Sequence, residues 1–169
     1  MSKILEPNAL LEFFKERRSI RIYKNKMIPD EEIEMILEAG RWAPSASNRQ
    51  PWEFIIIQNR EILKNISGTY SSFLEYAPVA IAIIGKPYKS PNWYVIDTSL
   101  ASMNMILMAW SLGIGTCWLG SLNREKVKEL LELGPNDFVL TVLPFGYVRR
   151  NIPRPNFRKD LKKISREIK

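Results

Sequence analysis

A basic run near the start of the chain has the composition of an anion-binding segment. Residues 17–21 read RRSIR. In extended backbone Arg17, Ser19 and Arg21 share one side of the strand, and Arg18 and Ile20 share the other. A guanidinium fork grips two phosphate oxygens at once, and each charge-assisted hydrogen bond contributes about 1.5–3 kcal/mol. The run therefore predicts a phosphate cradle, with a solvated basic face as the alternative.

A polar loop closed by prolines is the second candidate, at residues 43–54, which read APSASNRQPWEF. Pro44 ends the preceding helix because its ring cannot donate into the helical ladder. Ser45, Ser47, Asn48 and Gln50 supply neutral donors and acceptors, which can rim a planar heterocycle without adding charge to it. The alternative is an ordinary polar turn whose side chains bond its own backbone.

The stretch GIGTCWLG at residues 113–120 is the third candidate. Its glycines follow a helix and precede a short strand, which is the reverse of a dinucleotide-binding fingerprint, so we exclude that site. The main-chain N–H groups of Leu119 and Gly120 can meet a ligand, because glycine permits close approach. Cys117 is interpreted as a small core residue, since no histidine or obvious cation activates its thiol.

Alternating helical and strand patterns position these three stretches. The strand at 52–58 is expected at the centre of a sheet, and the strand at 79–85 is expected to be buried on both faces. The segment at 93–112 is apolar nearly all round, which predicts a helix in the core or in a subunit interface. Helices are further expected at 8–16 with Asn8 as the cap, from Pro29 toward Trp42, from Asn59 to Gly68 and from Asn123 to Gly134, and a last strand at 138–148 with a bend at Pro144.

Composition narrows the class of protein. A chain of 169 residues with 46% hydrophobic content predicts one domain. One cysteine excludes an internal disulfide, and the absence of a leader pattern or a convincing membrane span predicts a soluble, cytoplasmic protein. The net charge of +7 favours either nucleic acid or a small anionic cofactor as a partner. With no histidine and one cysteine, a metal site is not expected.

Taken in order, RRSIR, APSASNRQPWEF, GIGTCWLG and the PFGYV that precedes a basic tail resemble the FMN-dependent nitroreductase family, over nearly the whole chain. The resemblance implies an α+β fold in which helices flank a mostly antiparallel central sheet. It also implies an intertwined homodimer with two FMN sites across its interface. Residues 1–169 are then one domain, and residues 149–169 form a C-terminal extension that reaches the partner subunit.

The resemblance assigns roles to the candidate residues. Arg17, Arg18 and Ser19 resemble the family's grip on the FMN phosphate and ribityl chain, and Arg21 resembles the cation near the flavin pyrimidine edge, where positive charge favours the reduced state. The backbone of Leu119 and Gly120 matches the segment that meets flavin N5. The remaining implied contacts are Ser45, Ala46, Ser47, Asn48 and Gln50 from the second subunit, and the basic pair Arg158 and Lys159 at the phosphate.

The implied activity is hydride transfer from NAD(P)H through flavin N5 to a nitroaromatic, quinone or similar small-molecule acceptor by a ping-pong cycle. Such a step needs no acidic or basic side chain, which agrees with a chain that lacks histidine. A reductive dehalogenase or a flavin-cleaving enzyme on the same fold is an alternative. Two further alternatives are a basic nucleic-acid-binding domain and a flavin carrier without turnover. For the oxidoreductase that we predict, neither nucleic acid nor a membrane is expected as a partner.

Overall fold

The computed structural model describes residues 6–150 and 157–168 of the chain. They belong to two compact units, one formed by residues 18–150 and the other by the two terminal segments. Each unit is described by itself. The helices are α1 (Pro7–Glu16), α2 (Asp30–Arg41), α3 (Arg60–Ile66), α4 (Tyr94–Ser111) and α5 (Arg124–Leu130), with single-turn segments at Ala46–Asn48, Ser72–Tyr76 and Leu161–Lys163; the strands are β1 (Trp52–Ile57), β2 (Val79–Gly85), β3 (Ile114–Thr116) and β4 (Phe138–Tyr147).

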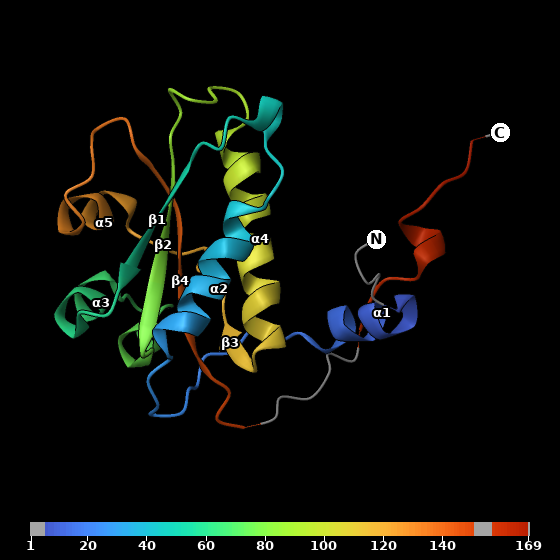
Figure 1. Cartoon of the computed structure of the whole chain (residues 1–169), viewed down its shortest axis with the longest axis horizontal. Coiled ribbons are helices and arrows are strands. Elements are labelled where there is room, and N and C mark those ends of the chain that lie inside the picture. Colours follow the sequence, from blue (N-terminus) through green and yellow to red (C-terminus); the bar gives the residue numbers. More distant parts are fainter. Residues whose placement is uncertain (1–5, 151–156, 169) are drawn as a thin grey trace. The chain divides into compact units, whose positions relative to one another are not determined.

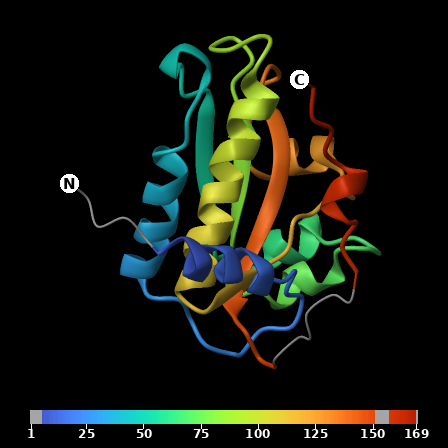
Figure 2. The same ribbon diagram turned by 90° about the vertical axis from the view of Figure 1, so that its right-hand side faces the viewer.

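The four strands form one sheet in the order β1-β2-β4-β3, and every neighbouring pair is antiparallel. In Figures 1 and 2, α2 and α4 lie along one face of this sheet, and α3 and α5 lie on the other face. The expected α+β architecture, a mostly antiparallel central sheet flanked by helices, is confirmed. The sheet and its two helical layers are the frame on which the candidate site is built.

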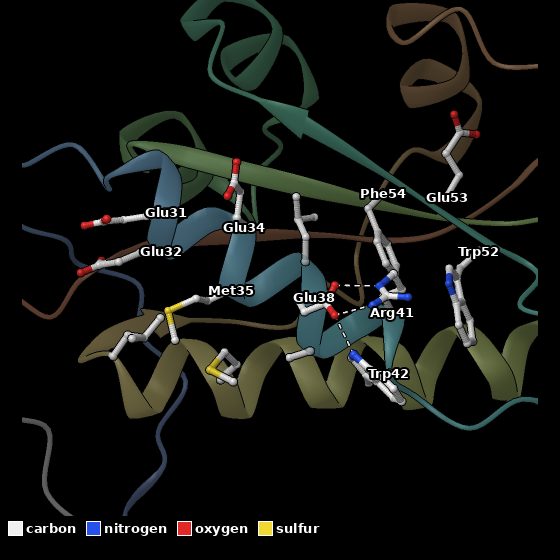
Figure 3. Close-up of a pocket in the computed structure, with 14 residues that line it drawn as sticks. Glu31, Glu32, Glu34, Met35, Glu38, Arg41, Trp42, Trp52, Glu53 and Phe54 are labelled. Carbon is white, nitrogen blue, oxygen red and sulfur yellow. Dashed lines mark hydrogen bonds and ion pairs between the residues drawn. The ribbon is translucent and has the colours of Figure 1, made fainter.

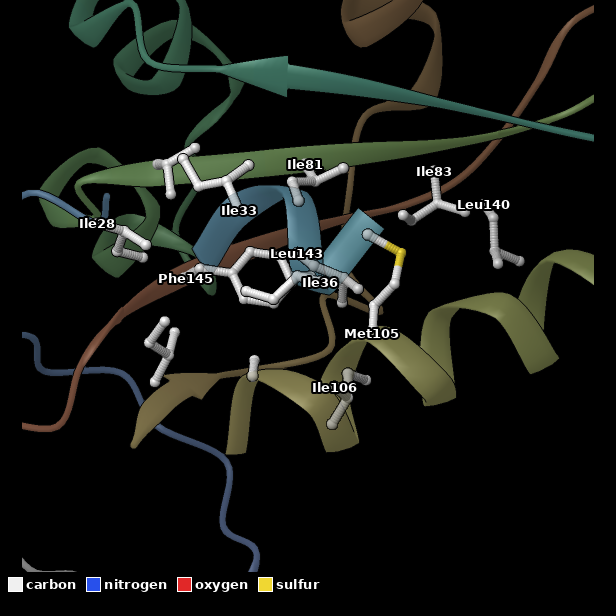
Figure 4. Packing of buried hydrophobic residues seen from close by; sticks show 13 residues of the cluster. Ile28, Ile33, Ile36, Ile81, Ile83, Met105, Ile106, Leu140, Leu143 and Phe145 are labelled. Carbon is white, nitrogen blue, oxygen red and sulfur yellow. The ribbon is translucent and has the colours of Figure 1, made fainter. Parts of the chain in front are cut away.

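Strand β2 is buried along its whole length, as its sequence VAIAIIG predicts. Val79, Ile81 and Ile83 point into the cluster beneath α2 and α4, where Met105 and Phe145 complete the packing (Figure 4). The alternate residues of β2 point the other way, into a second cluster beneath α3 and α5. Because side chains alternate between the two faces of a strand, β2 contributes apolar side chains to both clusters.

The expectation that residues 52–58 form a central strand is wrong, because β1 is an edge strand of the four-stranded sheet. Its apolar run nevertheless leaves Ile56 45% exposed. A run of apolar residues predicts that the faces of a strand are covered, but it does not predict how many strands pair with it. An edge strand with an exposed apolar side chain is suited to pairing or packing with another chain.

Two local expectations also need correction. Asn8 does not cap α1, because the helix begins one residue earlier, at Pro7. The Glu6 carboxylate is the cap and accepts the N–H groups of Asn8 and Ala9 at 3.0 and 2.7 Å. In β4, Pro144 keeps its register opposite Ala80, and the irregularity falls instead between the partners of Ile83 and Ile84.

Helix α4 is the long helix that the sequence predicts, and only one of its faces is covered in the described chain. Ala101, Met105 and Ala109 are fully buried against the sheet side. On another face Ile96 is 51% exposed, and Leu100 and Met103 are each 41% exposed. In the part of the chain that the structure describes, no helix is both long and apolar enough to cross a membrane.

Candidate active site

Residues 18–21 lie in extended backbone beside β3. Ser19 makes a parallel bridge with Thr116, and the N–H of Ile20 donates to the carbonyl oxygen of Thr116 at 2.9 Å. Arg18 and Ile20 are buried, whereas Ser19 and Arg21 are exposed. The alternation expected from the sequence is therefore confirmed for these four residues, and it presents a hydroxyl and a guanidinium on the same outer side.

Two glycines make this close approach possible. Gly115 of β3 pairs with Gly146 of β4, so neither strand has a side chain at that point. A Cβ atom on Gly115 would lie 2.3 Å from Cγ1 of Ile20, and one on Gly146 would lie 2.7 Å from the Tyr23 ring. The Tyr23 hydroxyl in turn donates to the Ile20 carbonyl at 2.8 Å, and burial raises the pKa of that hydroxyl. Ile20 and Tyr23 thereby fix the backbone on either side of Arg21.

Arg21 has an aromatic neighbour. Its guanidinium carbon lies 5.6 Å from the centroid of the Phe73 ring, within the range of a cation–π contact. Phe73 belongs to the single-turn segment Ser72–Tyr76 and packs partly against the cluster beneath α3 and α5. Sequence reasoning did not single out Phe73, because nothing local links it to a residue 52 positions earlier.

Leu119 and Gly120 follow β3 across the face that carries α3 and α5. The Leu119 side chain is buried in the second cluster, and its carbonyl accepts the Thr141 hydroxyl at 3.0 Å. Gly120 is exposed, and a Cβ atom built on it would find nothing within 4 Å. The side chain of Leu119 thus anchors this segment, while the backbone at Gly120 borders open space.

The polar loop is folded back on itself. The Ser45 hydroxyl accepts the N–H of Gln50 at 3.0 Å, and the Gln50 side-chain amide donates to the Asn48 carbonyl at 3.2 Å. Ser47, Asn48 and Gln50 all have positive φ, at 53°, 55° and 48°. Non-glycine residues rarely adopt this conformation, and it clusters at ligand-binding segments. The side chains of these three residues are exposed.

A buried carboxylate holds this loop in place. Asp97, in the first turn of α4, is 2% exposed and accepts the N–H of Ala46 at 3.0 Å and the Ser90 hydroxyl at 3.1 Å. A negative charge is also favourable near a helix N-terminus. The sequence carries a signal for this role that we did not use, since Asp97 is an isolated charge in an otherwise apolar helix.

One chain does not bring all the expected site residues together. The loop is held at the N-terminal end of α4, whereas β3, which pairs with Ser19, follows the C-terminal end of the helix (Figure 1). From Asp97 to Ser111 the helix rises about 21 Å at 1.5 Å per residue. Ser19, Arg21, Leu119 and Gly120 lie on one side of this separation, and Ser45, Ala46, Ser47, Asn48 and Gln50 lie on the other.

The remaining basic residues belong to the terminal unit. Arg17 closes α1, and Arg158 and Lys159 are exposed near the C-terminus. Their assignment to a phosphate group stays a prediction. Residues 157–168 contain one short turn, Leu161–Lys163. Residues 151–156 of the expected extension lie outside the described residues.

A groove of about 1380 Å³ lies over α2 and the edge strand β1 (Figure 3). Its floor is apolar and includes Met35, Phe54 and Met108. Glu38 accepts hydrogen bonds from Arg41 and from the Trp42 indole at 2.5–2.7 Å, and these bonds lower the pKa of its carboxyl to about 2. The acidic residues that line the groove are Glu31, Glu32, Glu34, Glu38 and Glu53.

The positive charge of the chain is concentrated far from this groove in sequence. Residues 149–169 hold nine arginines and lysines but only two acidic residues. Their net charge of +7 equals that of the whole chain, because residues 1–148 hold sixteen residues of each sign. The net positive charge that favoured nucleic acid in the sequence is therefore carried by the C-terminal tail.

Comparison with known proteins identifies the class. The family model for the nitroreductase family matches residues 14–69 and 64–147. The chain therefore belongs to the nitroreductase family, and the predicted resemblance and oxidoreductase class are confirmed. A protein of Archaeoglobus fulgidus provisionally named NADH dehydrogenase/NAD(P)H nitroreductase is 43% identical over 78% of this chain and 80% of its own length. Iodotyrosine deiodinase of Hydra vulgaris is 27% identical over 88% of this chain and 68% of its own.

Solved structures agree with this assignment. A protein of Bacteroides thetaiotaomicron, provisionally named NADH dehydrogenase/NAD(P)H nitroreductase, superposes with a TM-score of 0.87 at 34% identity, over 95% of this chain and 98% of its own. An FMN-dependent nitroreductase of Clostridium difficile gives a TM-score of 0.80 at 32% identity, over 86% of this chain and 91% of its own.

Proposed function

We propose that the protein is an FMN-dependent oxidoreductase that takes reducing equivalents from NAD(P)H and acts as a homodimer in the cytoplasm. When bound, FMN supplies hydride transfer at N5, first from NAD(P)H and then to a nitroaromatic, quinone or similar acceptor in a ping-pong cycle. The observation that carries the proposal is the grouping of Ser19, Arg21 and the open backbone at Gly120 around β3 in a chain of this family. The named relatives support the choice of donor and cofactor.

The residues around β3 fit such a cofactor. The Thr116 hydroxyl, beside Ser19, is buried and has no hydrogen-bond partner in the described chain. Ser19 and Arg21 are exposed and offer a hydroxyl and a charged fork. Gly120 leaves room for a planar group to approach its backbone. A ligand that joins an anionic tail to a flat polar ring suits the two exposed features, the Ser19–Arg21 pair and the backbone at Gly120.

In this proposal each residue has one task. Arg17, Arg18 and Ser19, with Arg158 and Lys159, hold the phosphate and the ribityl chain. Arg21 places positive charge at the pyrimidine edge, which favours uptake of electrons by the ring. The backbone of Leu119 and Gly120 faces the N5 side. Hydrogen bonds from the polar loop orient the ring and ribityl chain against the incoming donor.

The second subunit completes the site in this proposal. Because α4 rises about 21 Å between Asp97, which holds the loop, and Ser111, which precedes β3, we infer that the loop reaches the cofactor from another copy. The exposed stripe of Ile96, Leu100 and Met103 on α4 supplies an apolar surface for that association. Burial of such a stripe is worth about 25 cal/mol per Å² removed from water.

The tail has a matching surface for the same assembly. Phe157, Leu161, Ile164 and Ile168 are all more than 60% exposed. The basic side chains that alternate with them complement the acidic rim of the groove over α2, whose floor is apolar. We therefore propose that residues 149–169 reach the partner subunit and that the groove is their docking surface.

The alternatives differ in substrate rather than in site. A reductive dehalogenase is favoured by the Hydra relative, whose name specifies deiodination of iodotyrosine. The short connection between β2 and α4, residues 86–93, has no covering segment dedicated to one substrate. That openness supports flat and varied acceptors. A flavin-cleaving enzyme and a carrier without turnover remain outcomes of the test below.

The experiment is a spectral titration of the purified protein. A flavin absorbance spectrum at one FMN per chain is expected, followed by bleaching on addition of NADH or NADPH and recovery on addition of a nitroaromatic or quinone. Bleaching without recovery by any acceptor would indicate a carrier, and deiodination would select the dehalogenase. A colourless protein that takes up no added FMN would falsify the proposal.

A further inference from the structure

Arg21 is a long, flexible side chain on an exposed surface, so its charge needs an orienting contact. An arginine side chain has many rotamers, and a solvated one occupies many positions. The backbone under Arg21 is fixed by Ile20 and Tyr23, but these residues do not fix the guanidinium. The ion pairs found within residues 6–150 and 157–168 do not include Arg21.

Phe73 provides the orienting contact at 5.6 Å. The segment that carries Phe73 is itself held firmly. Leu74 beside it is fully buried, and the Arg60 guanidinium donates to the carbonyls of Glu75 and Ala77 at 2.9 and 3.3 Å. The aromatic ring is therefore a fixed platform, and the guanidinium is the part that can move.

An aromatic partner differs from a carboxylate in a way that matters for redox chemistry. A carboxylate would orient the guanidinium but would cancel most of its charge. The face of a phenyl ring attracts the cation without neutralising it. Stacking also leaves the in-plane N–H groups of arginine able to donate to a ligand at the edge.

We propose that Phe73 is a positioning residue that holds the Arg21 guanidinium, at full charge, against the pyrimidine edge of the FMN ring. The inference rests on the proposed function, because it concerns the same site. It adds that the preference of the site for the reduced cofactor depends on a residue that itself carries no charge. Phe73 also packs on the cluster that contains Leu119, so one apolar cluster supports both the Arg21 side and the Gly120 side of the site.

The test is a double-mutant cycle on the midpoint potential of bound FMN, measured by spectroelectrochemistry. Arg21→Gln removes the charge, and Phe73→Leu keeps an apolar side chain but removes the ring face. Arg21→Gln should lower the potential, and Phe73→Leu should lower it by part of that amount. For Phe73→Leu we expect a roughly threefold loss of preference for reduced over oxidised FMN, which is about the size of an exposed cation–π contact. For a two-electron couple a tenfold change corresponds to roughly 30 mV, so the midpoint potential should fall by about 15 mV.

The outcomes separate the possible roles of Phe73. In the Arg21→Gln background, Phe73→Leu should change the potential no further, whereas any loss of thermal stability should persist. Phe73→Tyr keeps the ring and should keep the wild-type potential. An unchanged potential in FMN-loaded Phe73→Leu, or additive effects in the double variant, would overturn the positioning role and leave the proposed function intact. Failure of the wild-type protein to bind FMN would overturn both.

Discussion

The carboxylate of Asp97 accepts the backbone N–H of Ala46 at 3.0 Å, across 51 residues of sequence. This bond joins the first turn of α4 to the polar loop, whose backbone contains three non-glycine residues at positive φ. Strained backbone of this kind persists only where its surroundings hold it. Asp97 ties the loop to the first turn of α4.

Asp97→Ala should therefore loosen the loop as well as destabilise the protein. The substitution leaves the Ala46 N–H and the buried Ser90 hydroxyl without their acceptor, which costs about 1–3 kcal/mol. Urea unfolding measures that loss, and FMN fluorescence quenching should show a raised dissociation constant. Asp97→Asn keeps an acceptor for the Ala46 N–H, so its stability and its FMN affinity should lie between those of Asp97→Ala and wild type. Wild-type values for Asp97→Ala would contradict the anchoring role.

The pair Gly115→Ala and Gly120→Ala should separate folding from binding. A methyl group at Gly115 would meet the rigid Cβ and Cγ1 of Ile20 at 2.5 and 2.3 Å, so we expect a loss of about 1–3 kcal/mol in the free energy of unfolding together with weaker FMN binding. At Gly120 the methyl group meets no protein atom. We expect unchanged stability within about 0.5 kcal/mol but weaker FMN binding, because the methyl group occupies ligand space.

Equal FMN affinity in Gly120→Ala and wild type would place the ring elsewhere. Wild-type stability in Gly115→Ala would show that residues 18–21 can lift from β3 without cost. Calorimetric unfolding and FMN titration on the same samples distinguish these results. Each glycine variant serves as the control for the other.

Charge reversal should test the docking of the tail. Glu31→Lys with Glu34→Lys on α2, or Lys162→Glu with Lys163→Glu in the tail, should weaken the dimer roughly two- to tenfold, since exposed ion pairs contribute about 0.2–1 kcal/mol each. The four changes together should restore the dimer. Sedimentation equilibrium measures the dimer dissociation constants, at low ionic strength because surface charges are least screened there.

Glu125→Lys with Glu129→Lys on α5 is the matched control, because both residues are exposed and neither lines the groove. This control should leave the dimer unchanged. If all the reversals behave like the control, the groove is not the docking surface of the tail. If the combined variant is weaker than either pair alone, the two surfaces do not face each other.

Tyr147 should make stability depend on pH in the alkaline range. Its hydroxyl donates to Glu32 at 2.5 Å, and chiefly this hydrogen bond raises the pKa of Tyr147 from 10.0 to about 12. A raised folded pKa gives stability that is fully present below pH 10 and is lost as the pH rises through 12. Between pH 10 and 12 the free energy of unfolding of Tyr147→Phe should therefore fall less steeply than that of wild type.

Glu32→Gln should reduce the same slope, because it removes the charge that opposes ionisation of Tyr147. Chemical unfolding at several pH values across this range gives the slopes directly. Parallel curves for Tyr147→Phe and wild type would mean that Tyr147 ionises alike in the folded and unfolded chain.

Local sequence patterns were enough to predict the main elements and the residue types of the site. Helical spacing and period-two alternation predict α2, α4 and β2, and they place Ser19 and Arg21 opposite Arg18 and Ile20. These signals are local, because one segment presents its own apolar face whatever that face later meets. For the same reason four short motifs in order were enough to indicate the family.

The contacts between distant segments could not be predicted in this way. The edge position of β1, the Gly115–Gly146 pairing beneath Ile20, the contact of Arg21 with Phe73 and the bond from Ala46 to Asp97 all join residues far apart in sequence. No periodicity records such partners, since the pairing order of strands and the packing across a sheet are set by the whole core. The separation of the loop from Arg21 by the length of α4 likewise became visible only in the folded chain.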